Sequence, residues 1–183
     1  NEELLNNLLL EEGAELVVDA NTLTISKVAD KGGIICNGKL ILGTAILEGN
    51  GDFVVGDKAT LMIGSDAGID KKSLQGNIQL TGKKDFSKEA VYHFNGTVKQ
   101  HTGNGLPAVL KNLVIDNPSG VELDQNMQVQ QQITLLEGVL QTGNYTLTLG
   151  SSTSNICQLN SDKGALSGNI KIWFGQGNFD KLN

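Results

Sequence analysis

The chain has 183 residues, of which 39% are hydrophobic and 19% charged, and it contains 23 glycines and only two prolines. This length suits one domain, and the apolar content excludes a disordered tail. All 14 basic residues are lysines, and 20 acidic residues bring the net charge to −6, so nucleic acid is not an expected partner. No apolar run approaches the ~18 residues of a membrane span, so no membrane insertion is expected either.

The first residues, Asn1-Glu2-Glu3, lack the basic region of a signal peptide. We therefore expect residues 1–183 to be a single domain that is a fragment of a longer chain. Residues 2–12 are consistent with either of two structures. One is a short helix with an acidic start, which Gly13 would end, and the other is a strand over residues 8–11.

The rest of the chain repeats a period of two. Short segments alternate apolar with polar or small residues, and each is closed by Gly, Asn, Asp or Ser, which is typical of short, half-buried strands. These segments are 22–26, 39–43, 52–56, 60–64, 77–80, 112–116, 120–124, 146–150 and 169–172. The sequence therefore predicts an all-β protein.

One strand type recurs along the chain, and residues 59–65 and 75–80 are matched in sequence at 145–151 and 167–172, as one module used twice. Such repetition favours an irregular right-handed parallel β-helix, a β-solenoid whose strands stack on their equivalents in the next coil. At roughly 20 residues per coil there would be about eight coils, a rod of roughly 40 Å. The alternative is a β-sandwich, with hairpin turns at Asn37-Gly38 and Asn95-Gly96.

A solenoid predicts which side chains face its core, because side chains alternate across a strand. The inward set is Leu61, Ile63, Leu147 and Leu149, and the outward set is Thr60, Met62, Thr146 and Thr148. A solenoid also separates Cys36 from Cys157, 121 positions away, by about five coils or roughly 25 Å. Because a disulfide needs Cα atoms within about 7 Å, we expect two unpaired, mostly buried thiols.

His93 and His101 are the only histidines of the sequence. Zinc ligands usually lie about two to five residues apart, with cysteine or carboxylate close by, whereas these are eight apart and remote from either cysteine. We expect no metal ligation, with His93 facing solvent on a strand and His101 in a loop. Tyr92 and Phe94 should share the opposite face of that strand.

Carboxylates are concentrated in the longest polar stretch, residues 65–89. They are Asp66, Asp70, Asp85 and Glu89. Two carboxyl groups within about 5 to 10 Å would suit a glycosidase. Lysines are interleaved with them, at Lys71, Lys72, Lys83, Lys84 and Lys88. A solvated loop of mixed charge is therefore the favoured interpretation.

Three further groups are interpreted as structural. Asp116, Asn117, Asp124 and Asn126 offer oxygen ligands for calcium, but their spacing departs from an EF-hand loop and suits turns. Gly32-Gly33 and Gly103-Asn104-Gly105 are predicted to be corners rather than phosphate loops. A stacked polar row is predicted for Gln128, Gln130, Gln131 and Gln132.

The two ends of a solenoid expose strand edges unless something caps them. Leu4, Leu5, Leu8, Leu9 and Leu10 are available at the first coil, and Trp173, Phe174 and Phe179 at the last. Trp173 and Phe174 would alternatively stack on a sugar, although a core or cap role is more usual. The C-terminal cap is predicted to be the weaker, with weak end-to-end self-association as the result.

Several runs resemble a known group of proteins. Residues 51–69, 75–79, 92–96, 102–107, 113–121 and 138–150 look like the repeat regions of large, secreted, adhesin-like surface proteins of Bacteroidota. The resemblance extends over most of the chain from about Gly13 onward, and it implies a β-solenoid, export by type IX secretion and a secreted or cell-surface location. Those repeats have no assigned catalytic residues, so no catalytic, cofactor-binding or metal-binding residue is expected here.

The expected function is that of a structural or adhesive module, a stalk or partner-presenting surface, and not that of an enzyme. Its partners would be neighbouring domains of the same parent protein and a surface glycan or protein. The alternatives are a carbohydrate-binding module and a polysaccharide-active β-helix enzyme. The absence of arginine and the charge of −6 would restrict either to neutral glycans.

Overall fold

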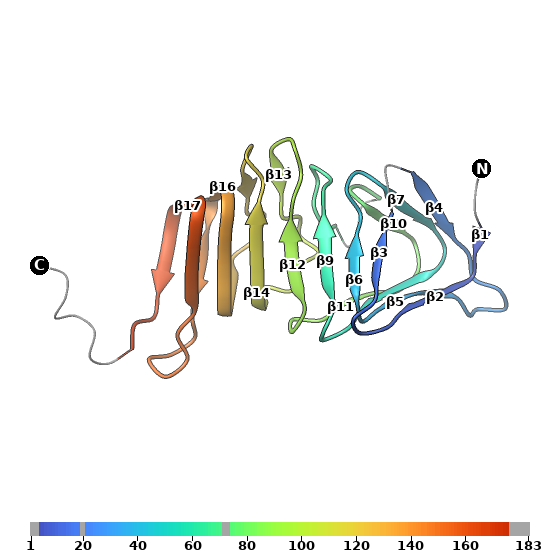
Figure 1. Ribbon diagram of the computed structural model, residues 1–183, viewed down its shortest axis with the longest axis horizontal. Helices are drawn as coiled ribbons and strands as arrows, with labels where there is room; N and C mark the ends of the chain where they lie inside the picture. The colour runs from blue at the N-terminus through green and yellow to red at the C-terminus, as the bar shows by residue number, and fades with distance from the viewer. Residues whose placement is uncertain (1–3, 19–20, 71–73, 176–183) are drawn as a thin grey trace, which may run out of the picture.

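The computed structural model describes residues 4–18, 21–70 and 74–175, which wind into stacked coils of parallel strands (Figure 1). The predicted β-helix is confirmed, and the alternative β-sandwich is wrong. In the described ranges, antiparallel pairing is limited to isolated bridges within loops, namely Val28 with Lys31, Ile69 with Gly76 and Ser152 with Asn155. No described residue belongs to a helix that could cross a membrane.

The first coils each give one strand to each of three parallel sheets. Sheet A contains β1 (Leu4–Leu5), β4 (Thr22–Ile25), β7 (Ile46–Gly49) and β10 (Ile78–Leu80). Sheet B contains β2 (Asn7–Leu10), β5 (Gly33–Cys36), β8 (Asp52–Val55) and β11 (Lys84–Phe86). Sheet C begins with β3 (Glu15–Val17), β6 (Lys39–Ile41), β9 (Thr60–Ile63) and β12 (Val91–Phe94).

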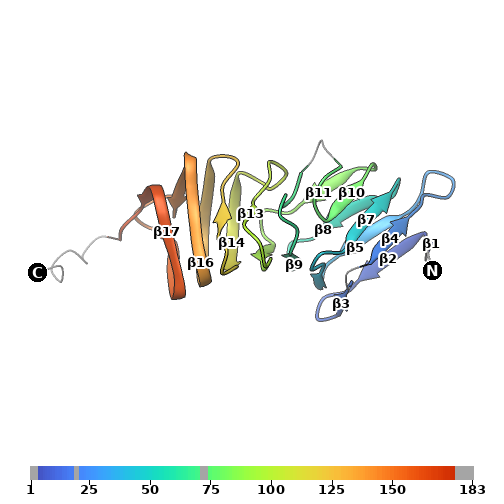
Figure 2. The same cartoon turned by 90° about the horizontal axis from the view of Figure 1, so that it is seen from above.

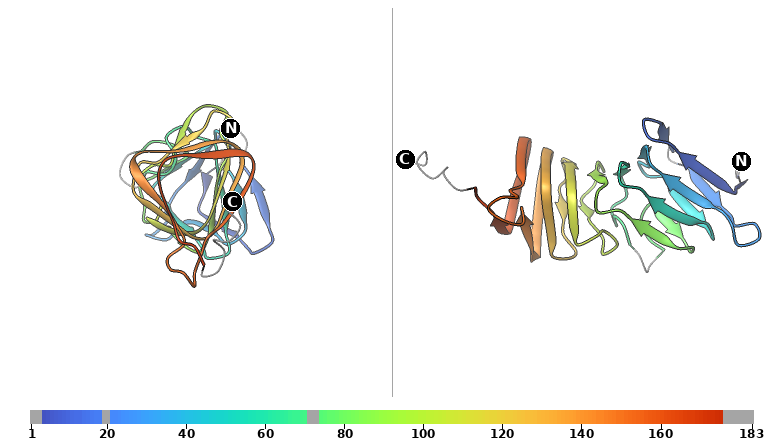
Figure 3. Two further views of the ribbon diagram at one scale, coloured as in Figure 1. Left: turned by 90° about the vertical axis from the view of Figure 1, so that its left-hand side faces the viewer. Right: turned by 90° about the horizontal axis from the view of Figure 1, so that it is seen from below.

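Sheet C continues through the rest of the described chain. It takes in β13 (Gln100–His101), β14 (Val109–Asp116), β15 (Val121–Glu122), β16 (Met127–Leu149) and β17 (Gln158–Ile172). β16 and β17 turn round corners of the coil, which gives the C-terminal part a rounded triangular outline when seen from its end (Figure 3).

The core consists of apolar rows that run along the axis. One of them, here called the axial row, passes through sheet C from Leu16 to Leu159 by way of Leu40, Leu61, Tyr92, Leu113 and Ile133. Between its two ends every member is at most 1% exposed. Burial of each such side chain contributes about 1.5–3 kcal/mol, and each is covered by the coils before and after it.

The predicted separation of inward and outward side chains is confirmed. The inward set, Leu61, Ile63, Leu147 and Leu149, is buried. The outward set, Thr60, Met62, Thr146 and Thr148, is partly exposed to solvent.

The stack bends between its first coils and its later ones (Figure 2). Sheets A and B end at this bend, with β10 and β11 as their last strands. In β11, Lys84 occupies the inward row that Phe53 fills one coil earlier, and an inward-pointing charge opposes the pairing of a further strand. The Lys84 ammonium donates to the carbonyl oxygens of Ile78 (3.3 Å) and Asp70 (3.5 Å), and burial lowers its pKa.

The alternative helix over residues 2–12 is wrong for the described part of that range. Residues 4–10 supply β1 and β2, and Leu8 and Leu10 stack on Ile34 and Cys36 of the next coil. Side chains alternate between the two faces of β2, so these two leucines face the core while Leu9 points outward and is exposed.

The sequence repeat is not a structural repeat. Its first copy places β9 in sheet C and β10 in sheet A, whereas residues 146–149 of its second copy pair directly with residues 169–172. The residues common to both copies are those of a strand and the corner after it, and such a pattern can occur on any side of a coil. Asn37-Gly38 and Asn95-Gly96 are corners after β5 and β12 rather than hairpin turns.

Candidate functional site

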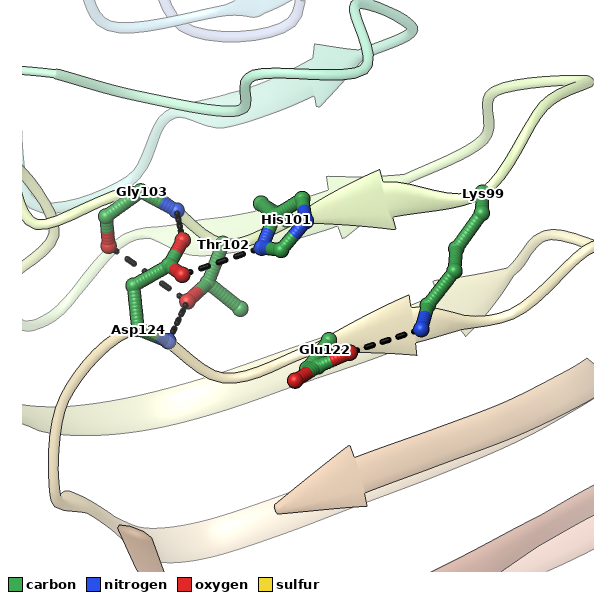
Figure 4. A network of polar contacts seen from close by, with 6 residues as sticks. All are labelled: Lys99, His101, Thr102, Gly103, Glu122 and Asp124. Carbon is green, nitrogen blue, oxygen red and sulfur yellow. Dashed lines mark hydrogen bonds and ion pairs between the residues drawn. The ribbon is translucent and has the colours of Figure 1, made fainter. Parts of the chain in front are cut away.

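A polar network on β13, β15 and the residues that flank them is the candidate site (Figure 4). The Lys99 ammonium lies 2.7 Å from the Glu122 carboxylate, and Nδ1 of His101 lies 3.0 Å from Oδ1 of Asp124. Both pairs join residues 23 positions apart on successive coils. The Lys99 ammonium, as hydrogen-bond donor and as charge, lowers the pKa of Glu122.

Backbone groups fix the position of Asp124 in this network. The Gly103 N–H donates to Oδ2 of Asp124 (2.8 Å), and the Asp124 N–H donates to the Thr102 hydroxyl (3.1 Å). Gly103 has a φ of +72°, and a Cβ at this position would overlap the carbonyl oxygen of Ile69. The local sequence thus needs glycine for both conformation and space.

The ion pairs and hydrogen bonds of this network join side chains of successive coils. A histidine on a carboxylate is one half of a nucleophilic triad, which also needs a hydroxyl or thiol within reach of the other ring nitrogen. The hydroxyl of Thr102 is instead occupied by the Asp124 N–H and by the carbonyl oxygen of Gly103 (3.4 Å). The His101 side chain is 49% exposed, so the site also lacks the shielding that strengthens catalytic electrostatics.

His93 lies on the outer face of a strand, as expected, but is less exposed than expected, and His101 lies in a strand rather than in the expected loop. His93 points outward from β12, as predicted from buried Tyr92 and Phe94, but its side chain is only 15% exposed because Asp116 of the next coil covers it at 3.4 Å. Burial lowers the pKa of His93, and the nearby Asp116 carboxylate opposes that shift. His101 lies in strand β13 rather than in a loop.

The structure distributes the carboxylates of residues 65–89 over separate segments. Asp66 and Asp70 follow β9, and the Asp66 carbonyl accepts from the His101 N–H. Asp85 lies exposed on the outer face of β11, whereas Glu89 forms an ion pair with Lys111 of the next coil. The Glu89–Lys111 ion pair and the exposure of Asp85 agree with the mixed-charge interpretation. Lys71 and Lys72 lie outside the described residues.

Three of the four residues weighed as calcium ligands lie at corners, and the fourth, Asp116, ends strand β14. Asn117 accepts from the Ser119 N–H, and its amide donates to the carbonyl oxygen of Val98. Asn126 accepts from the Thr146 N–H at 2.9 Å. Asp124 lies beside His101, and the turn interpretation is confirmed for Asn117, Asp124 and Asn126, whereas Asp116, beside His93, is the last residue of strand β14. Gly103-Asn104-Gly105 is likewise a corner, where the Gly105 N–H donates to the Ile69 carbonyl.

Buried amides at the corners were not found from the sequence. Asn77 donates to the carbonyl oxygens of Gly43 (2.9 Å) and Ala45 (2.6 Å) and accepts from the Ser65 N–H. Gln100 donates to the carbonyl oxygens of Ile63 (2.9 Å) and Ser65 (2.8 Å) and accepts from Gly96 and Asn117. Their only sequence signal is an amide close to a corner glycine, which occurs at many exposed turns as well.

The predicted glutamine row is confirmed in part. Gln132 stands in register with Asn112 and Gln158 on the outer face of sheet C. Gln128 instead donates to the carbonyl oxygen of Gly150 at 2.8 Å. Gln130 and Gln131 lie beside them in β16.

The thiols are unpaired, as predicted. Cys36 is fully buried, and burial raises its pKa to about 11. Cys157 is only partly buried, although burial raises its pKa as well. The expectation of mostly buried thiols therefore holds for Cys36 and is too strong for Cys157, which belongs to the less covered C-terminal end.

A shallow apolar groove crosses the outer face of sheet B. Leu9, Ile35 and Val54 stack across β2, β5 and β8, and Asp30 and Lys31 lie at its side. The loop that carries them turns through Ala29 and Asp30, both with positive φ. Gly32-Gly33 closes this loop, and a Cβ at Gly33 would collide with the backbone of Asp52.

Across the described ranges, no group of three or more His, Cys, Asp or Glu side chains is arranged to hold a metal ion. The site consists of ion pairs between side chains and of buried amides, whose hydrogen bonds join successive coils. Comparisons of this chain with protein families, with curated proteins and with solved structures find no match.

Proposed function

We propose that this chain is a structural β-solenoid module of a larger secreted or cell-surface protein, which acts as a stalk or presents a surface to a partner. The observation that carries the proposal is the continuity of sheet C, whose axial row runs from β3 to β17 through the bend. A continuous ladder of parallel strands transmits load along the axis. The neighbouring domains of the parent protein are its first expected partners.

Polar side chains on the outside support a mechanical role. Ion pairs join successive coils or lie across two of them: Lys39–Glu15, Lys58–Glu12, Lys27–Asp52, Lys99–Glu122 and Lys111–Glu89. Each exposed pair contributes little by itself, about 0–1 kcal/mol. Together they keep adjacent coils in register, which a load-bearing rod needs.

Force spectroscopy of the chain between two handles tests this function. Equivalent positions in successive coils are 20 residues apart from Asn112 to Gln132 and 31 apart from Thr60 to Val91. Loss of one coil at a time should therefore lengthen the chain in steps of about 70–110 Å, since an extended residue spans about 3.5 Å. Smooth extension without steps would contradict a load-bearing role.

One observation favours a second function, the binding of neutral glycans. Trp173 is 44% exposed and adjoins exposed Phe174, and an exposed indole can stack on a sugar ring. Trp173 is the one tryptophan of the sequence, so its fluorescence reports directly on this position. Titration with neutral oligosaccharides should shift that emission if the module binds glycans. An unchanged spectrum would contradict glycan binding at Trp173.

A further inference from the structure

A shallow polar groove of about 380 Å³ runs along the side of the C-terminal coils, over β14, β16 and β17. Val109 of β14 lies in register with Gln128 of β16, and Thr148 of β16 lies in register with Lys171 of β17. All four of these residues line the groove. The groove is therefore formed by outward-facing side chains of successive coils, on the flank of the stack rather than at either end.

Two amide side chains in the groove are held by the backbone at one end only. Oδ1 of Asn126 accepts from the Thr146 N–H at 2.9 Å, and Nε2 of Gln128 donates to the carbonyl oxygen of Gly150 at 2.8 Å. A backbone N–H only donates and a carbonyl only accepts, so these partners fix the orientation of both amides. The opposite ends, Nδ2 of Asn126 and Oε1 of Gln128, have no hydrogen-bond partner among the described residues and are available to a ligand.

Hydroxyl and ammonium groups complete the polar lining. The hydroxyls of Thr146 and Thr148 lie on the outer face, and each can donate one hydrogen bond and accept two. Lys171 is exposed and forms no ion pair with any described residue. No acidic side chain is among the described residues that line the groove. A molecule rich in hydroxyl groups, which both donate and accept, matches this mixture of donors and acceptors.

Trp173 extends the groove along β17. Its N–H donates to the carbonyl oxygen of Leu149 at 2.9 Å, which continues the ladder of β17 by one residue. Side chains alternate along a strand, so Trp173 points to the same side as Lys171. A Cβ at Gly150 would lie 3.1 Å from the Cβ of Trp173, and Gly150 is also the residue that holds Gln128. A sugar ring in the groove can therefore pack its C–H face on the indole while its hydroxyls bond to the amides.

We propose that this groove binds a neutral oligosaccharide, with successive hexose units on successive coils. The proposal rests on glycan binding, the second function proposed above, and it names the binding site. Neighbouring strands lie about 4.8 Å apart, a spacing close to the length of one hexose unit. The units thus meet Gln128, Thr148 and Lys171 in turn. The net charge of −6 opposes the binding of acidic sugars.

Two nearly isosteric variants test the site by isothermal titration calorimetry with cellohexaose, laminarihexaose and mannohexaose. Asn126→Asp keeps the oxygen that accepts from the Thr146 N–H but replaces the free NH₂ donor with an oxygen. Thr148→Val removes a hydroxyl and keeps the shape of the side chain. The wild-type chain should bind at least one of the three sugars, and each variant should bind it about tenfold more weakly, since each loses one hydrogen bond to the ligand.

Matched controls carry the same chemical changes outside the groove. Asn104→Asp alters an exposed corner, and Thr60→Val alters the outer face of β9; both should bind like the wild type, and circular dichroism checks the folding of all four variants. Undiminished binding by Asn126→Asp and Thr148→Val would overturn the groove as the site and leave glycan binding itself standing. No binding of any neutral sugar by the wild type would overturn both. Tighter binding of hexagalacturonate than of the neutral sugars would overturn the proposed ligand class.

Discussion

At the residue scale, the outward-facing His93 couples stability to pH. Burial lowers its pKa in the folded chain, Lys39 adds to this effect, and the Asp116 carboxylate opposes it. The unfolded chain therefore takes up a proton first as pH falls below about 6.5, the usual histidine value. The contribution of neutral His93 to stability is present above that pH and is lost on acidification through the lowered pKa.

We expect the free energy of unfolding, measured in urea, to decrease from pH 7 to pH 5. A His93→Gln variant should flatten this decrease, whereas His101→Gln, which leaves His93 in place, should retain it. Asp52 and Glu122 also have lowered pKa values, but carboxylates lose their contribution below about pH 4.5, outside this range. Equal slopes in wild type and His93→Gln would show that His93 is not the group responsible.

A larger effect on the free energy of unfolding is expected at Gln100, whose side-chain amide is buried. Its removal leaves the carbonyl oxygens of Ile63 and Ser65 and the N–H of Gly96 without this partner. An unsatisfied buried polar group costs about 1–3 kcal/mol, so Gln100→Ala should lower the unfolding free energy by about 2–4 kcal/mol. Exposed Gln141, mutated to alanine, should change it by less than about 0.5 kcal/mol. Chemical denaturation of both variants measures the difference, and equal losses would contradict the role of the amide.

Residue-level features of this kind were the hardest to predict. Alternation identified Tyr92 and Phe94 as inward and His93 as outward, because side-chain direction is a local property of a strand. The burial of His93 depends on Asp116, 23 residues later, and Gln100 is buried through contacts with residues 37 and 35 positions away. Such distances in sequence carry no periodic signal, so only the stacked structure reveals them.

At the element scale, two glycines at corners offer a controlled comparison. Gly138 and Gly13 have nearly the same backbone, with φ of +81° and +83°. A Cβ at Gly138 would overlap the carbonyl oxygen of Asn117, whereas a Cβ at Gly13 would meet nothing within 4 Å. The two positions therefore differ in the space between coils and not in conformation.

Gly13→Ala should lower the unfolding free energy by about 1–2 kcal/mol, the cost of a left-handed backbone for an alanine. Gly138→Ala should lose about 1–3 kcal/mol more, because the backbone of the adjacent coil must shift. Thermal and urea denaturation of the two variants give the difference. Equal losses would mean that the backbone at Asn117 can shift without lowering the free energy of unfolding.

The strands themselves were largely predictable, and their arrangement was less so. Period-two segments located most strands, since that pattern is local. The end of sheet B at the bend was not predicted, because the position of Lys84 in the inward row of Phe53 can be recognised only once the register is known. The prediction that one structural module is used twice was wrong for the same reason, because similar sequences form strands at different positions in the coils.

At the scale of the whole molecule, each coil is stabilised by its neighbours, so the interior of the stack should be the most stable part. Hydrogen exchange at low protein concentration should be slowest in β9, β12 and β14 and faster toward β2 and β17. β2 and β17 open at a lower free energy because each pairs on one side only among the described strands. Uniform exchange in all coils would indicate a single cooperative unit instead.

Contacts between coils also determine how the chain can be made. Each pairing in sheet C joins segments 19 to 31 residues apart, as from Val121 to Leu140 and from Thr60 to Val91, so a coil needs only the one before it as a template. A nascent or translocating polypeptide can therefore add coils in the order in which they emerge, without waiting for the distant terminus. The growing edge then serves as the folding surface for the residues that leave the ribosome or channel next.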